Sequence, residues 1–540
     1  MPPALRLAPP GEWPRATIGE VLRRAAAAAP DVVALVDGVA DPAARTRTTY
    51  AALLGDAESL ARALAADFAP GERLAVALPT VPESLRCTYA AALAGLVLVP
   101  VNPLLRPHEL AHVLGQSGAA GIVCVGDHRG HDVAGAVAEV RTQLPALREV
   151  VDVAELDPRA QRADPTRSLP DVAPDAIAQI VFTSGTTGAP KGACLTHAGM
   201  THAARAGATR FDIREGDVYV DPLPLFHVGG QGVAFEIAHA RATYVLVRAF
   251  DPALVLDLVE QERGTLTVAV PPMLGALLAD EHLGARDLAS LRAISSGGAL
   301  VPAALVRRVR DELGASVTIV FGQTECCGFV SQTRLDDPPE LVEATLGTPL
   351  DGVDVRVVDP ATGDVVQTGE GGELEVRGPN VMVGYHDRPE ATAEAFHDGW
   401  LRTGDLVTLD DAGSLRITGR LKDMIVTGGV NVYAAEVEGA LLADLAVVEA
   451  AVFGVPDDHW GERVVAAVRL DPAPADADQE TAALDAVARR VAERLAPYKR
   501  PKQWMAVGAM PVTPSGKVHK FRLREQLGTP APPAGAAGET

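Results

Sequence analysis

The segment 181–192 reads VFTSGTTGAPKG and contains three glycines, four hydroxyl side chains and one lysine. Its first two residues are apolar and fit the end of a buried strand, so the polar part forms a loop beyond that strand. Glycines let the backbone approach a ligand, and successive N–H groups attract anions. Hydroxyl and ammonium groups donate to phosphate oxygens, so the loop is predicted to bind a polyphosphate. It is not a Walker A loop, because Lys191 precedes Gly192 rather than a serine or threonine.

Five further motifs follow this loop in the chain. They are PLFHVGG at 224–230, FGQTE at 321–325, TGDL at 403–406, GRLKDMI at 419–425 and PSGK at 514–517. Together with the loop, they resemble the motifs of the adenylate-forming superfamily, in the same order. This superfamily includes acyl- and aryl-CoA synthetases, the adenylation domains of nonribosomal peptide synthetases and firefly luciferase. Because the motifs extend from about residue 180 to 520, the resemblance covers nearly the whole chain.

Composition and charge narrow the class of protein. The 540 residues are 48% hydrophobic, which is enough for three or four structural units. A net charge of −22 argues against nucleic acid or an anionic membrane as a partner, because both bind basic surfaces. The five cysteines form no CxxC pair, and the apolar run 90–101 is shorter than the roughly 20 residues that span a bilayer. We expect a soluble cytoplasmic enzyme, monomeric or homodimeric.

The order of apolar segments predicts an α/β fold. Helix-like segments at 53–64 and 83–94 alternate with apolar strand-like segments at 73–78, 95–101 and 121–125, as in βαβ units around a parallel sheet. Segments 353–358 and 373–378 instead alternate charged and apolar residues, which predicts a small β subdomain. We therefore expect a large N-terminal adenylating domain (1–421), which holds ATP and the acyl group. A hinge would join it to a small mixed α/β C-terminal domain (422–525), followed by a disordered tail (526–540).

The segment 108–112 reads HELAH and matches the zinc-protease pattern HExxH. On a helix, His108 and His112 would share one face. The third ligand of the longer version of this motif would fall on Gly118, which has no side chain to offer. We interpret the segment as a surface helix whose apolar side packs on the sheet, and expect no zinc.

The resemblance implies a two-step reaction. A carboxylate attacks the α-phosphate of ATP to give an acyl-adenylate and pyrophosphate, and a thiol then displaces AMP to give a thioester. The residues implied in ATP binding are Thr183, Ser184, Gly185, Thr186, Thr187, Lys191, Gly298, Ala299, Phe321, Gly322, Thr324, Asp405, Arg420 and Lys517.

Several of these residues have individual roles in the resemblance. Thr324 donates to the α-phosphate, and Glu325 coordinates Mg²⁺, a hard cation that suits carboxylate oxygens. Asp405 accepts the ribose hydroxyls, with Arg420 as a nearby donor. Phe321 offers its ring to adenine, at a position where the family more often has tyrosine. Lys517 is the catalytic lysine of a mobile C-terminal domain that turns about a hinge at Lys422.

The acid is expected to bind near His227, which resembles the gate of the acyl pocket. The other implied pocket residues are Val228, Gly229, Gly297, Cys326 and Gly328. We interpret Cys326 as a wall residue rather than a nucleophile, because the reaction needs no enzyme thiol. The pocket segments carry no lysine or arginine, so the substrate is expected to be an apolar acid: a medium- or long-chain fatty acid, or a bulky aryl or polycyclic acid.

The thiol is expected to be that of CoA. Glycines 428 and 429 would line its tunnel, and Trp460, Tyr498, Arg500 and Lys502 resemble a site for the CoA nucleotide. The expected cofactors are therefore ATP, Mg²⁺ and CoA. Two alternatives remain open: a stand-alone enzyme that loads a carrier-protein phosphopantetheine, and a luciferase-like protein that makes no thioester.

Overall fold

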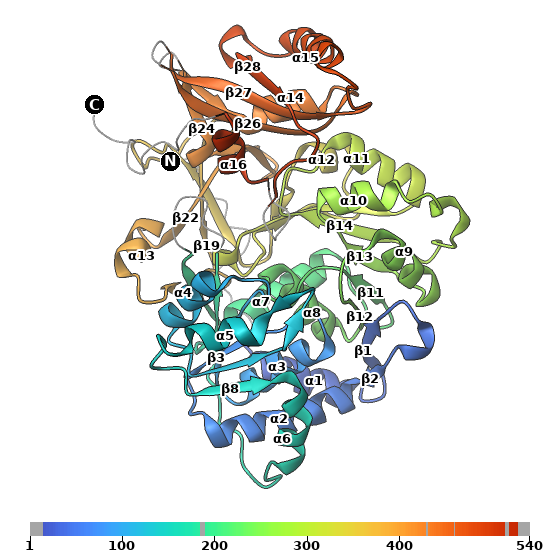
Figure 1. Cartoon of the computed structure of the whole chain (residues 1–540), viewed down its shortest axis with the longest axis vertical. Coiled ribbons are helices and arrows are strands. Elements are labelled where there is room, and N and C mark those ends of the chain that lie inside the picture. Colours follow the sequence, from blue (N-terminus) through green and yellow to red (C-terminus); the bar gives the residue numbers. More distant parts are fainter. Residues whose placement is uncertain (1–14, 184–189, 428–429, 458–459, 513–517, 528–540) are drawn as a thin grey trace.

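The computed structural model describes residues 15–183, 190–427, 430–457, 460–512 and 518–527. Two large sheets with helices on their faces form the N-terminal part, and a small β subdomain follows them. The C-terminal part has its own sheet and caps one end of the molecule (Figure 1). The predicted fold class, α/β with a large N-terminal and a small C-terminal part, is confirmed.

The seven-stranded sheet runs in the order β20-β10-β9-β4-β3-β5-β8. Its strands are β3 (Arg73–Ala77), β4 (Val97–Pro100), β5 (Gly121–Cys124), β8 (Glu149–Asp152), β9 (Ile177–Phe182), β10 (Gly192–Thr196) and β20 (Gly384–Tyr385). Strands β4, β3, β5 and β8 pair in parallel, and β4 is also parallel to β9. Strand β10 turns back antiparallel to β9, and β20 pairs with β10.

The nine-stranded sheet runs in the order β17-β16-β15-β14-β13-β11-β12-β1-β2. Its strands are β1 (Val33–Gly38), β2 (Arg47–Thr49), β11 (Val218–Asp221), β12 (Thr243–Val247), β13 (Leu266–Val268), β14 (Ala293–Gly297), β15 (Ser316–Phe321), β16 (Ser331–Gln332) and β17 (Thr348–Pro349). The central strands are parallel and their apolar side chains are buried, because helices cover both faces.

A layer of helices lies between the two large sheets and shares one core with both. It contains α1 (Ile18–Ala28), α2 (Tyr50–Asp67), α3 (Pro82–Leu93), α7 (His197–Arg210) and α8 (Val228–Ala240). The outer face of the seven-stranded sheet carries α4 (Pro107–Ser117) and α5 (Val133–Arg141). The outer face of the nine-stranded sheet carries α9 (Pro252–Gln261), α10 (Pro271–Leu278) and α11 (Ala303–Arg308). Among the described helices, none is long and apolar enough to cross a membrane.

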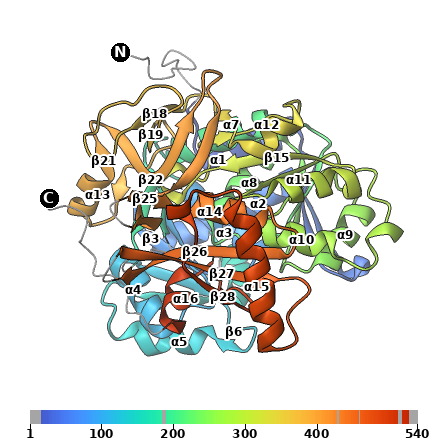
Figure 2. The same ribbon diagram turned by 90° about the horizontal axis from the view of Figure 1, so that it is seen from above.

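The small β subdomain and the C-terminal sheet meet at one short turn. The subdomain contains β18 (Asp354–Val358), β19 (Gly371–Arg377), β21 (Phe396–His397), β22 (Trp400–Leu409) and β23 (Leu415–Arg420). The C-terminal part contains β24 (Met424–Thr427), β25 (Val430–Tyr433), α14 (Ala434–Leu442), β26 (Val447–Asp457), β27 (Gly461–Leu470), α15 (Ala477–Ala492), β28 (Gln503–Ala506) and α16 (Lys520–Gln526). The 3₁₀ turn η6 (Leu421–Asp423) joins β23 to β24, and the C-terminal part has its own apolar cores. Figure 2 shows its helices α14, α15 and α16 beside the strands β26, β27 and β28.

The elements expected from the sequence are present with small shifts at their ends. The helix expected at 53–64 begins earlier, at Tyr50, because the Thr49 hydroxyl accepts the N–H of Ala52 and caps it. The strand expected at 95–101 is confined to β4, because Gly95 adopts a φ of 69° and forms the turn before it. The strands expected at 353–358 and 373–378 are β18 and β19.

Candidate active site

The predicted phosphate loop connects two antiparallel strands. It leaves the end of β9 and returns at the start of β10, where Phe182 and Gly192 face each other across the pair. The N–H of Thr183 donates to the carbonyl oxygen of Lys191 over 3.0 Å, which closes the base of the loop. Residues Ser184, Gly185, Thr186 and Thr187 lie outside the described residues, so their predicted contacts stay predictions.

A tyrosine connects the base of this loop to Glu325. The Lys191 ammonium lies 5.1 Å from the centre of the Tyr385 ring. The Tyr385 hydroxyl donates to a Glu325 carboxylate oxygen over 2.8 Å. Burial and the Glu325 charge raise the pKa of the Tyr385 phenol, so this hydroxyl stays protonated and donates. The structure therefore places Lys191 and the predicted magnesium ligand in one cluster.

The segment from Phe321 to Gly328 forms a tight turn after β15. A side chain at Gly322 would overlap the carbonyl oxygen of Gly328, so only glycine fits there. Thr324 and Glu325 lie in the 3₁₀ turn η5 (Thr324–Cys326), at the carboxyl end of β15. Burial raises the pKa of the Cys326 thiol, which is fully buried. This agrees with its interpretation as a wall residue, because a thiol in this state is a poor nucleophile.

Asp405 and Arg420 face each other on neighbouring strands. They are cross-strand partners in the β22–β23 pair, and the Arg420 Nε lies 2.8 Å from an Asp405 carboxylate oxygen. The Asp405 side chain is 3% exposed, whereas that of Arg420 is 41% exposed. The negative charges of Glu325 and Asp405 both raise the pKa of the Cys326 thiol. The carboxylates predicted to bind magnesium and ribose therefore lie near the same side chain.

The segment after β14 is shaped by its neighbouring strand. A side chain at Gly297 would overlap the carbonyl oxygen of Val320 on β15. Gly298 has a φ of 74°, a backbone conformation that favours glycine. Gly297 is the partner of Val320 in the β14–β15 pair, so the backbone that continues to Ala299 leaves the sheet beside the end of β15, where Phe321 is the last residue. This is the side of the site predicted to hold adenine.

Four of the predicted acyl-pocket residues lie at or beside the start of α8: His227, Val228, Gly229 and Gly328. His227 precedes the helix, and its ring centre lies 4.9 Å from that of Phe226. A side chain at Gly328 would come within 3.6 Å of Val228, so the two predicted wall segments are neighbours. One turn later, the Phe329 ring fills the notch at Gly232, where an added Cβ would lie 2.6 Å from a ring carbon. Gly229 lies between these contacts, on the first turn of the helix.

Buried donors at the same place offer a test of whether a nucleotide fits. The carboxyl ends of β11, β14 and β15 lead directly to His227, Gly297 and Thr324, as at the ligand-binding edge of a doubly wound sheet. Within the described residues, the Gln323 Nε2 and the Ser296 hydroxyl are buried without a hydrogen-bond partner. Buried polar groups are normally paired, so a polar ligand such as a nucleotide suits this site. Glu325 supplies the oxygen ligand that Mg²⁺ prefers.

Two of the predicted CoA residues, Trp460 and Lys502, lie together on the C-terminal part. The Lys502 ammonium is 3.5 Å from the centre of the Trp460 ring, and both side chains are exposed. Tyr498 is exposed as well, beside Lys499. Arg500 donates its Nε–H to the carbonyl oxygen of Leu495 and an Nη2–H to that of Ala492, the last residue of α15. These two bonds leave three of its N–H groups, so its predicted contact with CoA stays a prediction. Residues Gly428 and Gly429 are not among those that the structure describes.

The predicted hinge residue, Lys422, is the middle residue of the turn η6 and is exposed. A cavity of about 330 Å³ opens between the small β subdomain and the C-terminal part, next to this turn. It is lined by Leu300, Gly371, Gly372, Leu406, Ile417, Thr418, Tyr433, Ala435 and Glu436. The predicted catalytic Lys517 belongs to the part of the chain that the structure does not describe, so its role stays a prediction.

Three residues of this site were missed by the sequence analysis: Tyr385, Gln323 and His112. The His112 ring lies 2.8 Å from the carbonyl oxygen of Pro190, at the end of the phosphate loop. His112 therefore supports that loop, which gives the HELAH segment a use without zinc. Among the described residues, no group of three or more potential ligands could hold a metal ion. No local signal in the sequence marks Tyr385 or His112.

Comparisons with known proteins decide the family. Residues 22–386 match the family model of the AMP-binding enzyme, and residues 436–517 match that of the AMP-binding enzyme C-terminal domain. The chain belongs to the AMP-binding enzyme family. As a member of this adenylate-forming family, it is an acid–thiol ligase of the AMP-forming acyl-CoA synthetase type, and it uses ATP, Mg²⁺ and CoA.

Named relatives and solved structures resemble this family member over almost its whole length. A feruloyl-CoA synthase from Amycolatopsis sp is 39% identical over 487 residues, 89% of this chain and 94% of the relative. A 3-[(3aS,4S,7aS)-7a-methyl-1,5-dioxo-octahydro-1H-inden-4-yl]propanoyl:CoA ligase from Rhodococcus jostii (strain RHA1) is 35% identical, covering 94% of this chain and 98% of the relative. The crystal structure of the ATP-bound RpMatB-BxBclM chimera B1 is 31% identical and superposes with a TM-score of 0.86, covering 95% of this chain and 99% of that one.

Proposed function

We propose that this AMP-binding enzyme converts a compact aryl or polycyclic carboxylic acid to its CoA thioester. The observation that carries the choice of acid is the Phe329 ring, which fills the notch at Gly232 one turn into α8. This ring limits how far a substrate extends along the helix from His227. A flat ring system needs less room in this direction than a long alkyl chain. The feruloyl- and indenylpropanoyl-CoA ligases among the relatives support the same class of acid.

In the first step, the carboxylate of the acid attacks the α-phosphate, and the bond to pyrophosphate breaks. Two anions must approach each other, so donors and cations are needed around the phosphates. Thr324 donates to the α-phosphate, while Lys191 and the hydroxyls of 183–187 hold the β- and γ-phosphates. Asp405 accepts the ribose hydroxyls, and Arg420 orients it through their 2.8 Å contact. When bound at Glu325, Mg²⁺ supplies further positive charge to the phosphate oxygens.

Lys517 completes the adenylation site from the C-terminal domain. We place the domain boundary between residues 421 and 422, in the turn η6 that joins the two sheets. Rotation about Lys422 brings Lys517 to the carboxylate and the α-phosphate, and a further rotation removes it. Only one short connection lies between β23 and β24, which suits such a movement.

In the second step, the CoA thiolate attacks the acyl carbon and AMP leaves. Trp460 and Lys502 hold the CoA nucleotide through stacking and charge, since their side chains lie together and exposed. Gly428 and Gly429 line the path of the thiol. Arg500 also holds the end of α15 through its guanidinium.

A panel of acids tests this proposal. Pyrophosphate release is measured with ferulate, a polycyclic propanoate and fatty acids of increasing length, and the thioester is then detected by mass. We expect the ring acids to be preferred in wild type, and Phe329→Ala to raise activity with long fatty acids relative to ferulate. Gly275→Ala, on a helix position with open space around it, serves as a neutral control. A wild-type preference for long fatty acids would contradict the proposal.

The same assay separates the alternative thiol acceptor. Wild type is incubated with ATP, the preferred acid and either CoA or a phosphopantetheinylated carrier protein. A thioester formed only on the carrier protein would assign this enzyme to loading of a carrier instead of CoA ligation.

A further inference from the structure

Two buried glutamines connect the strand that leads to the phosphate loop with the helix that begins at the acyl pocket. Gln179 lies on β9, four residues before Thr183, and Gln231 is the fourth residue of α8. Each of the two glutamines is 1% exposed. The Gln179 Nε2 donates to the Gln231 Oε1, so the two side chains form a direct bridge from the seven-stranded sheet to α8.

The amide of Gln231 holds the segment that precedes α8. Its Nε2 donates to the carbonyl oxygen of Leu225 over 2.8 Å, and its backbone N–H donates to the carbonyl oxygen of His227 over 3.2 Å. The Leu225 N–H in turn donates to the Thr80 hydroxyl over 3.3 Å. Both polar groups of the Leu225 backbone are thus bound by side chains outside this segment. His227 lies two residues further on, so these contacts determine where it is held.

Gln179 fixes the direction of the Gln231 amide. Because the Gln231 Oε1 accepts from Gln179, the Nε2 of the same amide points to Leu225. Within the described part of the chain, the Gln179 Oε1 is buried without a hydrogen-bond partner. An unpaired buried oxygen lowers stability, and apolar side chains of similar size would pack here without that loss. Stability therefore does not account for the glutamine pair, whereas orientation of the segment before α8 does.

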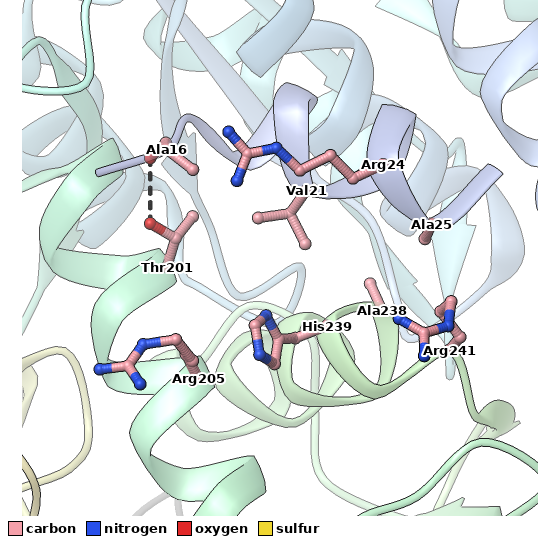
Figure 3. A pocket seen from close by; sticks show the side chains of 9 residues that line it. All are labelled: Ala16, Val21, Arg24, Ala25, Thr201, Arg205, Ala238, His239 and Arg241. Carbon is pink, nitrogen blue, oxygen red and sulfur yellow. Dashed lines mark hydrogen bonds between the residues drawn. The ribbon is translucent and has the colours of Figure 1, made fainter. Parts of the chain in front are cut away.

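The far end of α8 is packed less completely. A cavity of about 150 Å³ lies between α1, α7 and the last turn of α8. Figure 3 shows Ala238 and His239 of α8 below this cavity and Val21 of α1 above it. Because the cavity leaves this end of the helix without full contact, the contacts at the first turn contribute more to where α8 begins.

We propose that Gln231, oriented by Gln179, is a positioning residue that sets where His227 and the bound acid lie relative to the phosphate loop. This role rests on the proposed place of His227 at the acyl pocket, but not on which acid is activated. The first step joins a carboxylate oxygen to the α-phosphorus, so the acid and ATP must be held at a fixed separation. The glutamine pair is a direct side-chain link between the two elements that lead to these substrates, β9 and α8.

Steady-state kinetics of pyrophosphate release test this role, with the acid that wild type prefers. The test variants are Gln231→Met, Gln179→Met and the double variant, in which the side chains keep their length but lose the amide. Gln332→Met is the matched control. Gln332 is also a buried glutamine whose Oε1 has no partner within the described residues, but its Nε2 donates to Thr318 in the nine-stranded sheet. His227→Ala shows the effect of losing the gate itself, and a thermal melt checks the folding of each variant.

We expect Gln231→Met to raise the KM of the acid about tenfold and to leave the KM of ATP unchanged, because the buried Leu225 carbonyl loses its donor. Gln179→Met should raise the same KM by a smaller factor. The double variant should be no weaker than Gln231→Met, since both changes break one chain of hydrogen bonds. Gln332→Met should lower Tm and leave the KM of the acid as in wild type. If Gln231→Met does not fold, Gln179→Met, which keeps the donor to Leu225, decides by the same two KM values.

Two results would overturn the proposal, and they differ in what they say about the acyl pocket. If His227→Ala raises the KM of the acid while Gln231→Met lowers only Tm, Gln231 is structural and the place of His227 at the pocket stands. If neither variant changes this KM, His227 does not border the acid, and the positioning role of Gln231 is wrong as well.

Discussion

The hydrogen bond from Tyr385 to Glu325 makes a clear prediction about magnesium. Tyr385→Phe removes one hydroxyl and keeps the ring that faces the Lys191 ammonium. The lost bond is short, at 2.8 Å, and its acceptor is a carboxylate. Hydrogen bonds to charged groups contribute about 1.5–3 kcal/mol, and Glu325 is only half-buried, so the lower end of this range applies. About 1.4 kcal/mol corresponds to a factor of ten.

We therefore expect Tyr385→Phe to need about tenfold more Mg²⁺ for half-maximal pyrophosphate release. The measurement is the rate of the first step as a function of Mg²⁺ at saturating ATP and acid. Tyr498→Phe is the matched control, because Tyr498 lies exposed on the C-terminal part. A thermal melt confirms that both variants fold. An unchanged Mg²⁺ requirement in Tyr385→Phe would refute the idea that this hydroxyl orients a metal ligand.

Three further changes test other parts of the structure. Burial raises the pKa of Asp221 to about 7. The folded state therefore keeps a proton that the unfolded chain releases at lower pH, and the free energy of unfolding falls as pH rises from about 4 to 7. The Tm of Asp221→Asn relative to that of wild type should therefore be higher at about pH 8 than at about pH 5. An equal Tm difference at the two pH values would contradict this. Gly297→Ala should lower the free energy of unfolding, measured in urea, by about 1–3 kcal/mol, because the added Cβ overlaps the Val320 carbonyl oxygen. Gly275→Ala should leave this free energy unchanged, because its Cβ meets open space. Lys502→Ala should raise the KM for CoA about tenfold without slowing pyrophosphate release; equal damage to both steps would indicate a structural role.

The sequence predicts those parts of the site that are local in the chain. The phosphate loop and the turn at Glu325 each lie within one short motif, and the ribose pair comes from two such motifs. The resemblance to the family could therefore indicate these residues one by one. The α/β layers are equally local, because apolar periodicity is a property of each segment.

The residues that the sequence analysis missed come from parts of the chain that are far from their partners in the sequence. Tyr385 is 60 positions from Glu325 in the chain, and His112 is 78 positions from Pro190. A single sequence contains no sign that such pairs are neighbours. The two hydrogen bonds of Arg500 are a related case, since only the structure shows that this side chain donates to the carbonyl oxygens of Leu495 and Ala492.

The position of Arg420 has a consequence for the order of events in the catalytic cycle. Arg420 is the last residue of β23, it contacts the buried Asp405, and the next residue begins the turn η6. A ribose whose hydroxyls donate to Asp405 therefore competes with the Arg420 guanidinium for the same carboxylate, at the residue that directly precedes the turn η6. Arrival and departure of the nucleotide would act on the residue that directly precedes η6, the turn proposed as the hinge. The timing of domain rotation would then be set by the occupancy of the ribose site, without a separate signalling element.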